Sequence, residues 1–79
     1  MLTAEQVLEA YFLESRCMLL EIAAVLDRLD AAVDHDRNPA ALGDPRLEKI
    51  YQSLAILAER GSRPGRAEQL LTLFSDPIG

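Results

Sequence analysis

The sequence predicts an all-α protein in which one long N-terminal helix packs antiparallel against two shorter helices and the chain assembles as a dimeric helical bundle. Residues 3–33 contain no Gly or Pro and carry apolar residues at helical spacing. Two shorter segments with the same spacing follow, each bounded by Pro or Gly. The apolar fraction of 49% is more than a monomer of 79 residues can easily bury, which favours a second copy as partner.

The first helix is predicted over residues 4–34. Thr3 can cap its first turn, and Gln6 three residues later completes a Thr-x-x-Gln capping box. An advance of about 100° per residue gathers apolar residues on one broad face, here called the main stripe. The main stripe consists of Val7, Leu8, Tyr11, Met18, Leu19, Ile22, Val25, Leu26, Leu29 and Val33. This face is expected to pack against the rest of the chain.

A narrower apolar stripe lies on the far side of the same helix, and it is here called the second stripe. The second stripe consists of Leu13, Cys17, Leu20, Ala24 and Ala31. A helix that is apolar on two sides needs two neighbours, and the two shorter helices together can cover only one side of the long one. The second stripe is therefore predicted to be the interface of a homodimer in which two long helices pair. Cys17 is expected there as a small buried hydrophobe.

Residues 35–44 are predicted to form a loop, because Asp, Asn, Pro and Gly gather there and Pro39 cannot continue a helix. A second helix is predicted over residues 45–60, with Asp44 as its cap, Pro45 at its first position and Gly61 after its end. Its expected core stripe consists of Leu47, Ile50, Tyr51, Leu54, Leu57 and Ala58, with Ile56 outside the pattern and with Lys49 and Ser53 on the polar side.

A short third helix is predicted over residues 64–74, followed by an irregular tail, 75–79. Its expected inward residues are Ala67, Leu70, Leu71 and Phe74. The chain is too short for more than one domain and shows no internal repeat, so residues 1–79 are predicted to form a single helical domain.

Composition excludes several classes of partner. Thirteen acidic residues against eight basic ones give a net charge of −5, which argues against nucleic acid or an anionic membrane surface. The single cysteine cannot form an internal disulfide, and the sequence lacks both a signal peptide and a run of about 20 apolar residues. A cytoplasmic protein that binds other protein surfaces, including its own second copy, is expected.

Glu14, Glu21 and Arg28 follow one another at seven-residue intervals between the two apolar stripes, where charges are expected to be partly desolvated. Paired long helices would bring up to four of these carboxylates together, near the Cys17 thiols. Inward-facing Glu residues of this kind hold iron or manganese in ferritin-like bundles, although those sites use Glu-x-x-His pairs that this sequence lacks. The competing interpretation is that Glu14 and Glu21 form ion pairs across the bundle. Their candidate partners are Arg28, Arg16 and Arg46.

Two further patterns are incomplete. Asp34, Asp36 and Asn38 copy the first ligand positions of a calcium loop, but Pro39 replaces its Gly and Pro45 its last Glu. Three arginines bracket Gly61 and Gly65, where a phosphate could bind, but the strand and Lys of a nucleotide loop are missing. These arginines are Arg60, Arg63 and Arg66.

No complete catalytic motif is present, which favours a role other than catalysis. The sequence therefore predicts a small helical interaction or structural accessory protein that acts as a homodimer and binds a larger protein. The alternative is a carboxylate-lined metal-binding or redox bundle that uses Glu14 and Glu21 from paired long helices.

Overall fold

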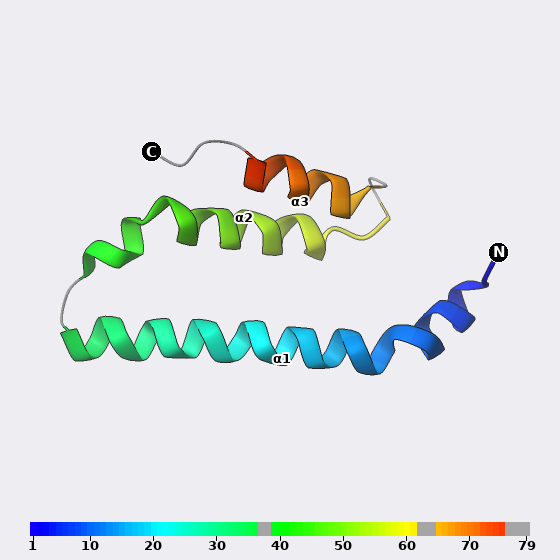
Figure 1. The fold of residues 1–79 in the computed structure, drawn as a ribbon, viewed down its shortest axis with the longest axis horizontal. Coiled ribbons are helices and arrows are strands. Elements are labelled where there is room, and N and C mark those ends of the chain that lie inside the picture. Colours follow the sequence, from blue (N-terminus) through cyan, green and yellow to red (C-terminus); the bar gives the residue numbers. More distant parts are fainter. Residues whose placement is uncertain (37–38, 62–64, 76–79) are drawn as a thin grey trace. The chain divides into compact units, whose positions relative to one another are not determined.

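A computed structural model describes residues 1–36, 39–61 and 65–75. In these ranges the chain is all-α, as predicted, with a long N-terminal helix and two shorter ones (Figure 1). The helices are α1 (Ala4–Asp36), the short 3₁₀ helix η1 (Pro39–Gly43), α2 (Pro45–Ala58) and α3 (Arg66–Ser75). The chain divides into two compact units, residues 1–37 and 38–79, and each is described by itself.

The N-terminus of α1 is fixed by the predicted capping box. The backbone N–H of Thr3 donates to Gln6 Oε1 at 2.9 Å, and the backbone N–H of Gln6 donates to Thr3 Oγ1 at 3.2 Å. These reciprocal bonds satisfy amide groups that have no partner inside the helix. No Gly or Pro interrupts the 33 residues that follow, and α1 runs to Asp36, two residues beyond the predicted end.

The connection before α2 is partly helical, since η1 occupies half of the segment predicted as a loop. Asp44 ends η1 by donating its backbone N–H to the carbonyl of Ala41 at 3.1 Å. Its side chain starts α2, because Oδ1 accepts the backbone N–H of Arg46 at 2.8 Å. The Arg46 guanidinium also approaches Asp44 Oδ2 at 2.7 Å. These hydrogen bonds from Arg46, with its positive charge, lower the pKa of the Asp44 carboxyl to about 2.

A corner of extended and left-handed backbone separates α2 from α3. Helix α2 ends at Ala58, two residues before the predicted boundary, because Glu59 turns to an extended conformation with ψ 128°. Gly61 then takes φ +63°, a conformation that side chains disfavour. The Arg66 guanidinium donates to the carbonyl of Glu59 and ties the start of α3 to the end of α2. Ser75 is still helical, whereas the other residues of the predicted tail, 76–79, and the predicted start at 64 lie outside the described residues.

Helices α2 and α3 pack against each other, but on the α2 side the contact does not use the stripe predicted from the sequence. The buried residues of α2 are Lys49 and Ser53, which share one helix face with the half-buried Ile56. This face lies roughly opposite the expected core stripe, in which Tyr51 remains exposed. In α3 the half-buried side chains are Gln69, Leu70 and Leu73; the expected inward residues Ala67, Leu71 and Phe74 are exposed.

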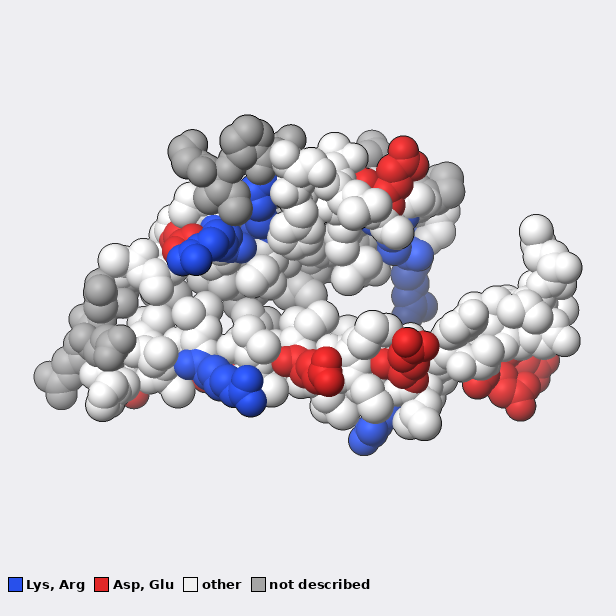
Figure 2. Space-filling view, in the orientation of Figure 1, with Lys and Arg blue, Asp and Glu red and all other residues white. Residues whose placement is uncertain are grey.

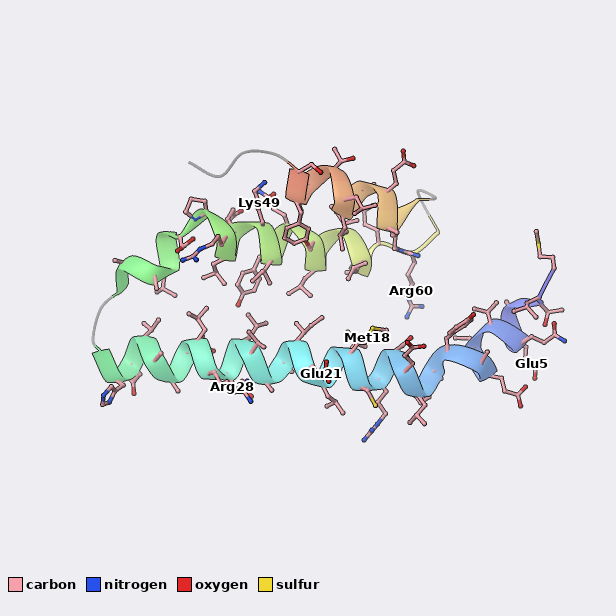
Figure 3. The ribbon with its side chains drawn as sticks, in the orientation of Figure 1. Glu5, Met18, Glu21, Arg28, Lys49 and Arg60 are labelled. Atoms are coloured by element: carbon pink, nitrogen blue, oxygen red, sulfur yellow. The ribbon has the colours of Figure 1, made fainter. Side chains whose placement is uncertain are left out.

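Lys49 is buried because its ammonium group meets an acceptor. Its Nζ donates to the carbonyl of Leu73 at 2.5 Å, in the last turn of α3, where carbonyl groups have no partner inside the helix (Figure 3). Its aliphatic stem contributes apolar surface to the contact between the helices. Ser53 donates its hydroxyl to the carbonyl of Lys49 at 2.7 Å, so neither polar side chain is buried without a partner. Lys49 and Ser53 therefore lie on the polar side of α2, as predicted, but both are buried, which the sequence did not indicate.

Replacing Asp44 with Asn tests the ion pair at the start of α2, because Asn still caps a helix but carries no charge. Asp44 has a lower pKa in the folded chain than its ordinary 3.8, so the stabilisation is complete above about pH 4 and disappears as pH falls through about 2. We expect the wild type to melt at a higher temperature than Asp44→Asn at neutral pH and at nearly the same temperature at about pH 2. Circular dichroism melts of both proteins measure this; a gap that does not change with pH contradicts it.

Replacing Lys49 with Met tests the hydrogen bond to α3, since Met keeps the stem and removes the donor. We expect the docking of α3 to weaken by about 1–2 kcal/mol, because the carbonyl of Leu73 loses a charged donor. Amide hydrogens of α3 should then exchange roughly 5–30 times faster, as measured by hydrogen exchange. Gln52→Met, at an exposed position of the same helix, is the matched control and should change the exchange little.

Candidate functional site

The second stripe of α1 is exposed along its whole length. Leu13 is 68% exposed and Leu20 is 54% exposed, and Cys17, Ala24 and Ala31 are also exposed. The expectation that Cys17 is buried is therefore wrong for the chain taken alone. Free apolar side chains in a row along a helix are typical of a surface that binds another protein. The residues predicted as an interface are thus accessible, and their pairing with a second copy stays a prediction.

The exposure of the second stripe is not offset by a buried apolar core elsewhere in the described residues. No apolar side chain in these ranges is buried. In the main stripe Leu8, Tyr11 and Leu19 are exposed, and four members towards the C-terminus of α1 are half-buried. These four are Ile22, Leu26, Leu29 and Val33. The described part of the chain therefore presents far more apolar surface than it hides.

Charged side chains of both signs are spaced along α1, with uncharged surface between them (Figure 2). Glu21 and Arg28 project from the same side of the helix (Figure 3). Glu14 and Glu21 are exposed rather than partly desolvated, and seven residues separate them by roughly 10 Å along the axis. Within the described ranges no ion pair involves either carboxylate, and Arg46, one predicted partner, instead binds Asp44. The ion-pair interpretation for these two residues is not met within one chain.

The described residues contain no group of three His, Cys, Asp or Glu side chains that could hold a metal ion. Iron or manganese binding by Glu14 and Glu21 would therefore need carboxylates from a second copy, as the sequence analysis assumed. The calcium pattern is not formed, because Asp34 and Asp36 are part of α1 while residue 38 lies outside the described residues. A calcium loop needs backbone that turns around the ion, which a continuous helix cannot provide.

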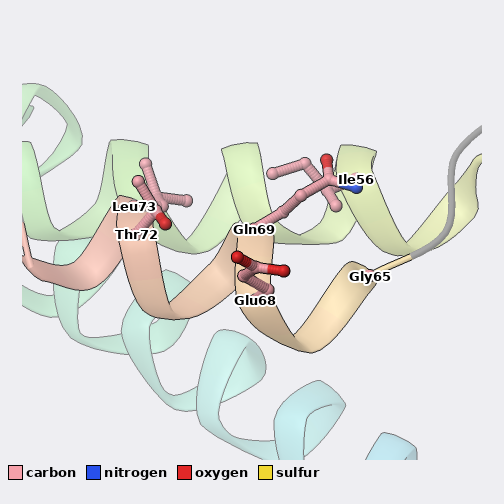
Figure 4. Close-up of a pocket in the computed structure, with 6 residues that line it drawn as sticks. All are labelled: Ile56, Gly65, Glu68, Gln69, Thr72 and Leu73. Atoms are coloured by element: carbon pink, nitrogen blue, oxygen red, sulfur yellow. The ribbon is translucent and has the colours of Figure 1, made fainter.

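A shallow groove of about 420 Å³ runs between α2 and α3 (Figure 4). Glu68, Gln69 and Thr72 form its polar edge, whereas Ile56 and Leu73 supply its apolar part. Glu68 is the only ionisable residue in this lining, so the groove lacks a pair of groups for acid–base chemistry. Sequence reasoning missed this groove, although the position of Ile56 outside the core stripe of α2 was a signal for a second contact face.

The predicted basic corner has a structural role in the described residues. Arg66 donates to the carbonyl of Glu59, the residue that follows the end of α2. Arg60 is exposed, and Arg63 lies outside the described residues. The geometry therefore favours a helix-to-helix connection here, and phosphate binding stays an untested expectation.

Comparison with known protein families, curated proteins and solved structures finds no match to this chain. Across the described ranges no helix combines the length and the apolar character that crossing a bilayer requires.

Metal binding by Glu14 and Glu21 predicts a different experimental result from ion pairing of the same two carboxylates. Since one chain brings too few ligands together, tight binding of iron or manganese would require the dimer and both carboxylates. Purified wild type would then hold stoichiometric metal, measured by mass spectrometry of the elements, and Glu14→Gln and Glu21→Gln would each abolish it. Glu5→Gln, at the exposed start of α1, is the control. Equal metal content in all four proteins contradicts the hypothesis.

Proposed function

We propose that this chain is a small interaction or structural accessory protein that works as a homodimer formed through α1. The single observation that supports this most is the exposure of the second stripe on a helix whose opposite face is also apolar. A neighbouring helix can cover only one of two opposite faces, so a second neighbour is needed to cover the other face of α1. A second copy is the simplest neighbour, because it brings an identical apolar stripe in equal amount.

The lengths of the helices strengthen this proposal. Helix α1, with 33 residues, is about 50 Å long, whereas the 14 residues of α2 span about 21 Å. Helix α3 packs on the face of α2 that carries Lys49 and Ser53, roughly opposite the expected core stripe of α2. That stripe is long enough to cover less than half of one face of α1. Even full use of it leaves the second stripe for another partner.

An accessory role follows from what the described residues lack as well as from what they expose. The groove between α2 and α3 has no pair of catalytic groups, and the exposed carboxylates of α1 stand about two helical turns apart. Exposed aromatic and aliphatic side chains such as Tyr11, Phe12 and Leu8 remain for a larger protein partner once the second stripe is used. The acidic net charge of −5 favours a protein surface with basic groups around the contact.

Light scattering coupled to size-exclusion chromatography tests the dimer. We expect a dimer in the wild type and a large loss of association in Leu20→Glu, because each copy loses an apolar contact and buries a charge. The loss of two leucine contacts, at roughly 2 kcal/mol each, corresponds to about a thousandfold higher Kd. Leu71→Glu, at a 70% exposed position of α3, is the matched control and should remain dimeric. A monodisperse wild-type monomer at high concentration overturns the proposal.

A further inference from the structure

We infer that the two copies of α1 pair antiparallel, with the two-fold axis at the level of residue 22, so that each second stripe faces the second stripe of the other copy. This inference rests on the proposed function, because it specifies the partner surface and the orientation of that homodimer. Three features of α1 determine the arrangement. They are the spacing of the stripe, the sizes of its side chains and the charges on its two flanks.

The spacing of the second stripe is that of a coiled-coil seam. Its members and Asp27 follow one another in alternating steps of four and three residues from position 13 to position 31. In heptad terms Leu13, Leu20 and Asp27 occupy the d positions, and the a positions are Cys17, Ala24 and Ala31. The seam spans about 27 Å of exposed helix surface, which two paired copies can share.

The sizes of the side chains favour the antiparallel direction. With the axis at residue 22, positions whose numbers add up to 44 lie opposite each other. Leu13 then meets Ala31 of the second copy, and Leu20 meets its Ala24, so every leucine faces a small residue. Large against small fills space closely and allows the two helix backbones to approach. A parallel pair would instead put alanine against alanine and leucine against leucine at successive levels.

The flanking charges favour the same register. A two-fold axis perpendicular to the helices places each flank of the seam opposite the same flank of the second copy. Glu14 lies two residues, or about 3 Å along the axis, from the level of Arg28 of the second copy. On the other flank Arg16 comes equally close to Asp30 of the second copy. Symmetry doubles both attractive pairs. The unfavourable features are the approach of Glu21 to its equivalent near the axis and the entry of the Asp27 carboxylate into the seam opposite Cys17.

Other pairings of the same stripe are less favourable. A parallel dimer sets Arg16 beside Glu21, but it also places Asp27 directly against Asp27 in the seam and Glu9 beside Glu14. In an antiparallel dimer shifted by one heptad towards the N-terminus, Glu14 of each copy lies beside Glu21 of the other copy. A shift in the opposite direction leaves Leu13 without a facing alanine. The register centred on residue 22 is the one that combines small-against-large packing with opposite charges on both flanks.

Cys17 reports on this arrangement, because it is the only thiol of the chain. In the proposed dimer the two copies of Cys17 stand ten residues, or about 15 Å, apart along the axis, too far for a disulfide. Position 27 of the second copy, in contrast, faces Cys17. We expect the oxidised Asp27→Cys variant to form a covalent dimer in which Cys17 is joined to the introduced thiol, as shown by non-reducing gels and peptide mass spectrometry. Oxidised wild type should stay uncrosslinked.

The Cys17→Ser, Asp27→Cys double variant is the matched control, and it should not crosslink because the thiols at position 27 also stand about 15 Å apart. A disulfide between two copies of Cys17 in the wild type, or of the introduced thiol in the double variant, overturns the antiparallel pairing. Light scattering under reducing conditions separates the two levels of failure. A reduced monomer refutes the homodimer itself, whereas a reduced dimer without the link between positions 17 and 27 refutes only the orientation and register.

Discussion

The main constraint on this chain is that α1 is apolar on two opposite faces and cannot cover either of them by itself. A continuous helix of 33 residues is stabilised mostly by what packs on it, because isolated helices are only marginally stable in water. The described residues contain no buried apolar side chain, so the chain has little core of its own to offer in return. The proposed association through the second stripe would supply apolar contacts that the described residues do not make among themselves.

The packing of α2 on α3 follows from the same shortage of apolar partners. The two helices meet through Ile56 and the stem of Lys49 on one side and Leu70 and Leu73 on the other, a contact with few apolar groups. Hydrogen bonds from Lys49 to the carbonyl of Leu73 and from Arg66 to the carbonyl of Glu59 add to it. Polar groups at the helix ends thus contribute to a contact that has few apolar side chains.

Local chemistry explains which parts of the fold the sequence could predict. The capping box of Thr3 and the Asp44–Pro45 start depend on neighbours only, and the structure has both. The burial of Lys49 depends on where the last turn of α3 lies, which no local pattern reveals. For the site, helical spacing defined the second stripe of α1, whose residues are exposed in the single chain and whose role as an interface stays a prediction. The groove beside Ile56 was missed because Lys49 and Ser53 were expected only on the polar side of α2. Polarity describes a side chain, not the acceptors that a neighbouring helix supplies.

In the proposed homodimer, the orientation of the two α1 helices distinguishes ion pairing from metal binding by the carboxylates of α1. In the antiparallel pairing Glu14 lies near an arginine of the second copy, and only the two copies of Glu21 meet, so four carboxylates cannot converge on one ion. A metal site of the ferritin-like kind would require Glu14 and Glu21 of both copies to face one another, which the same flank charges oppose. In the proposed dimer these exposed ion pairs would add little to affinity, since water and salt screen them, but together they would favour one register. Arg28, at the same heptad position as the two glutamates, would make this acidic flank complementary to the same flank of the second copy.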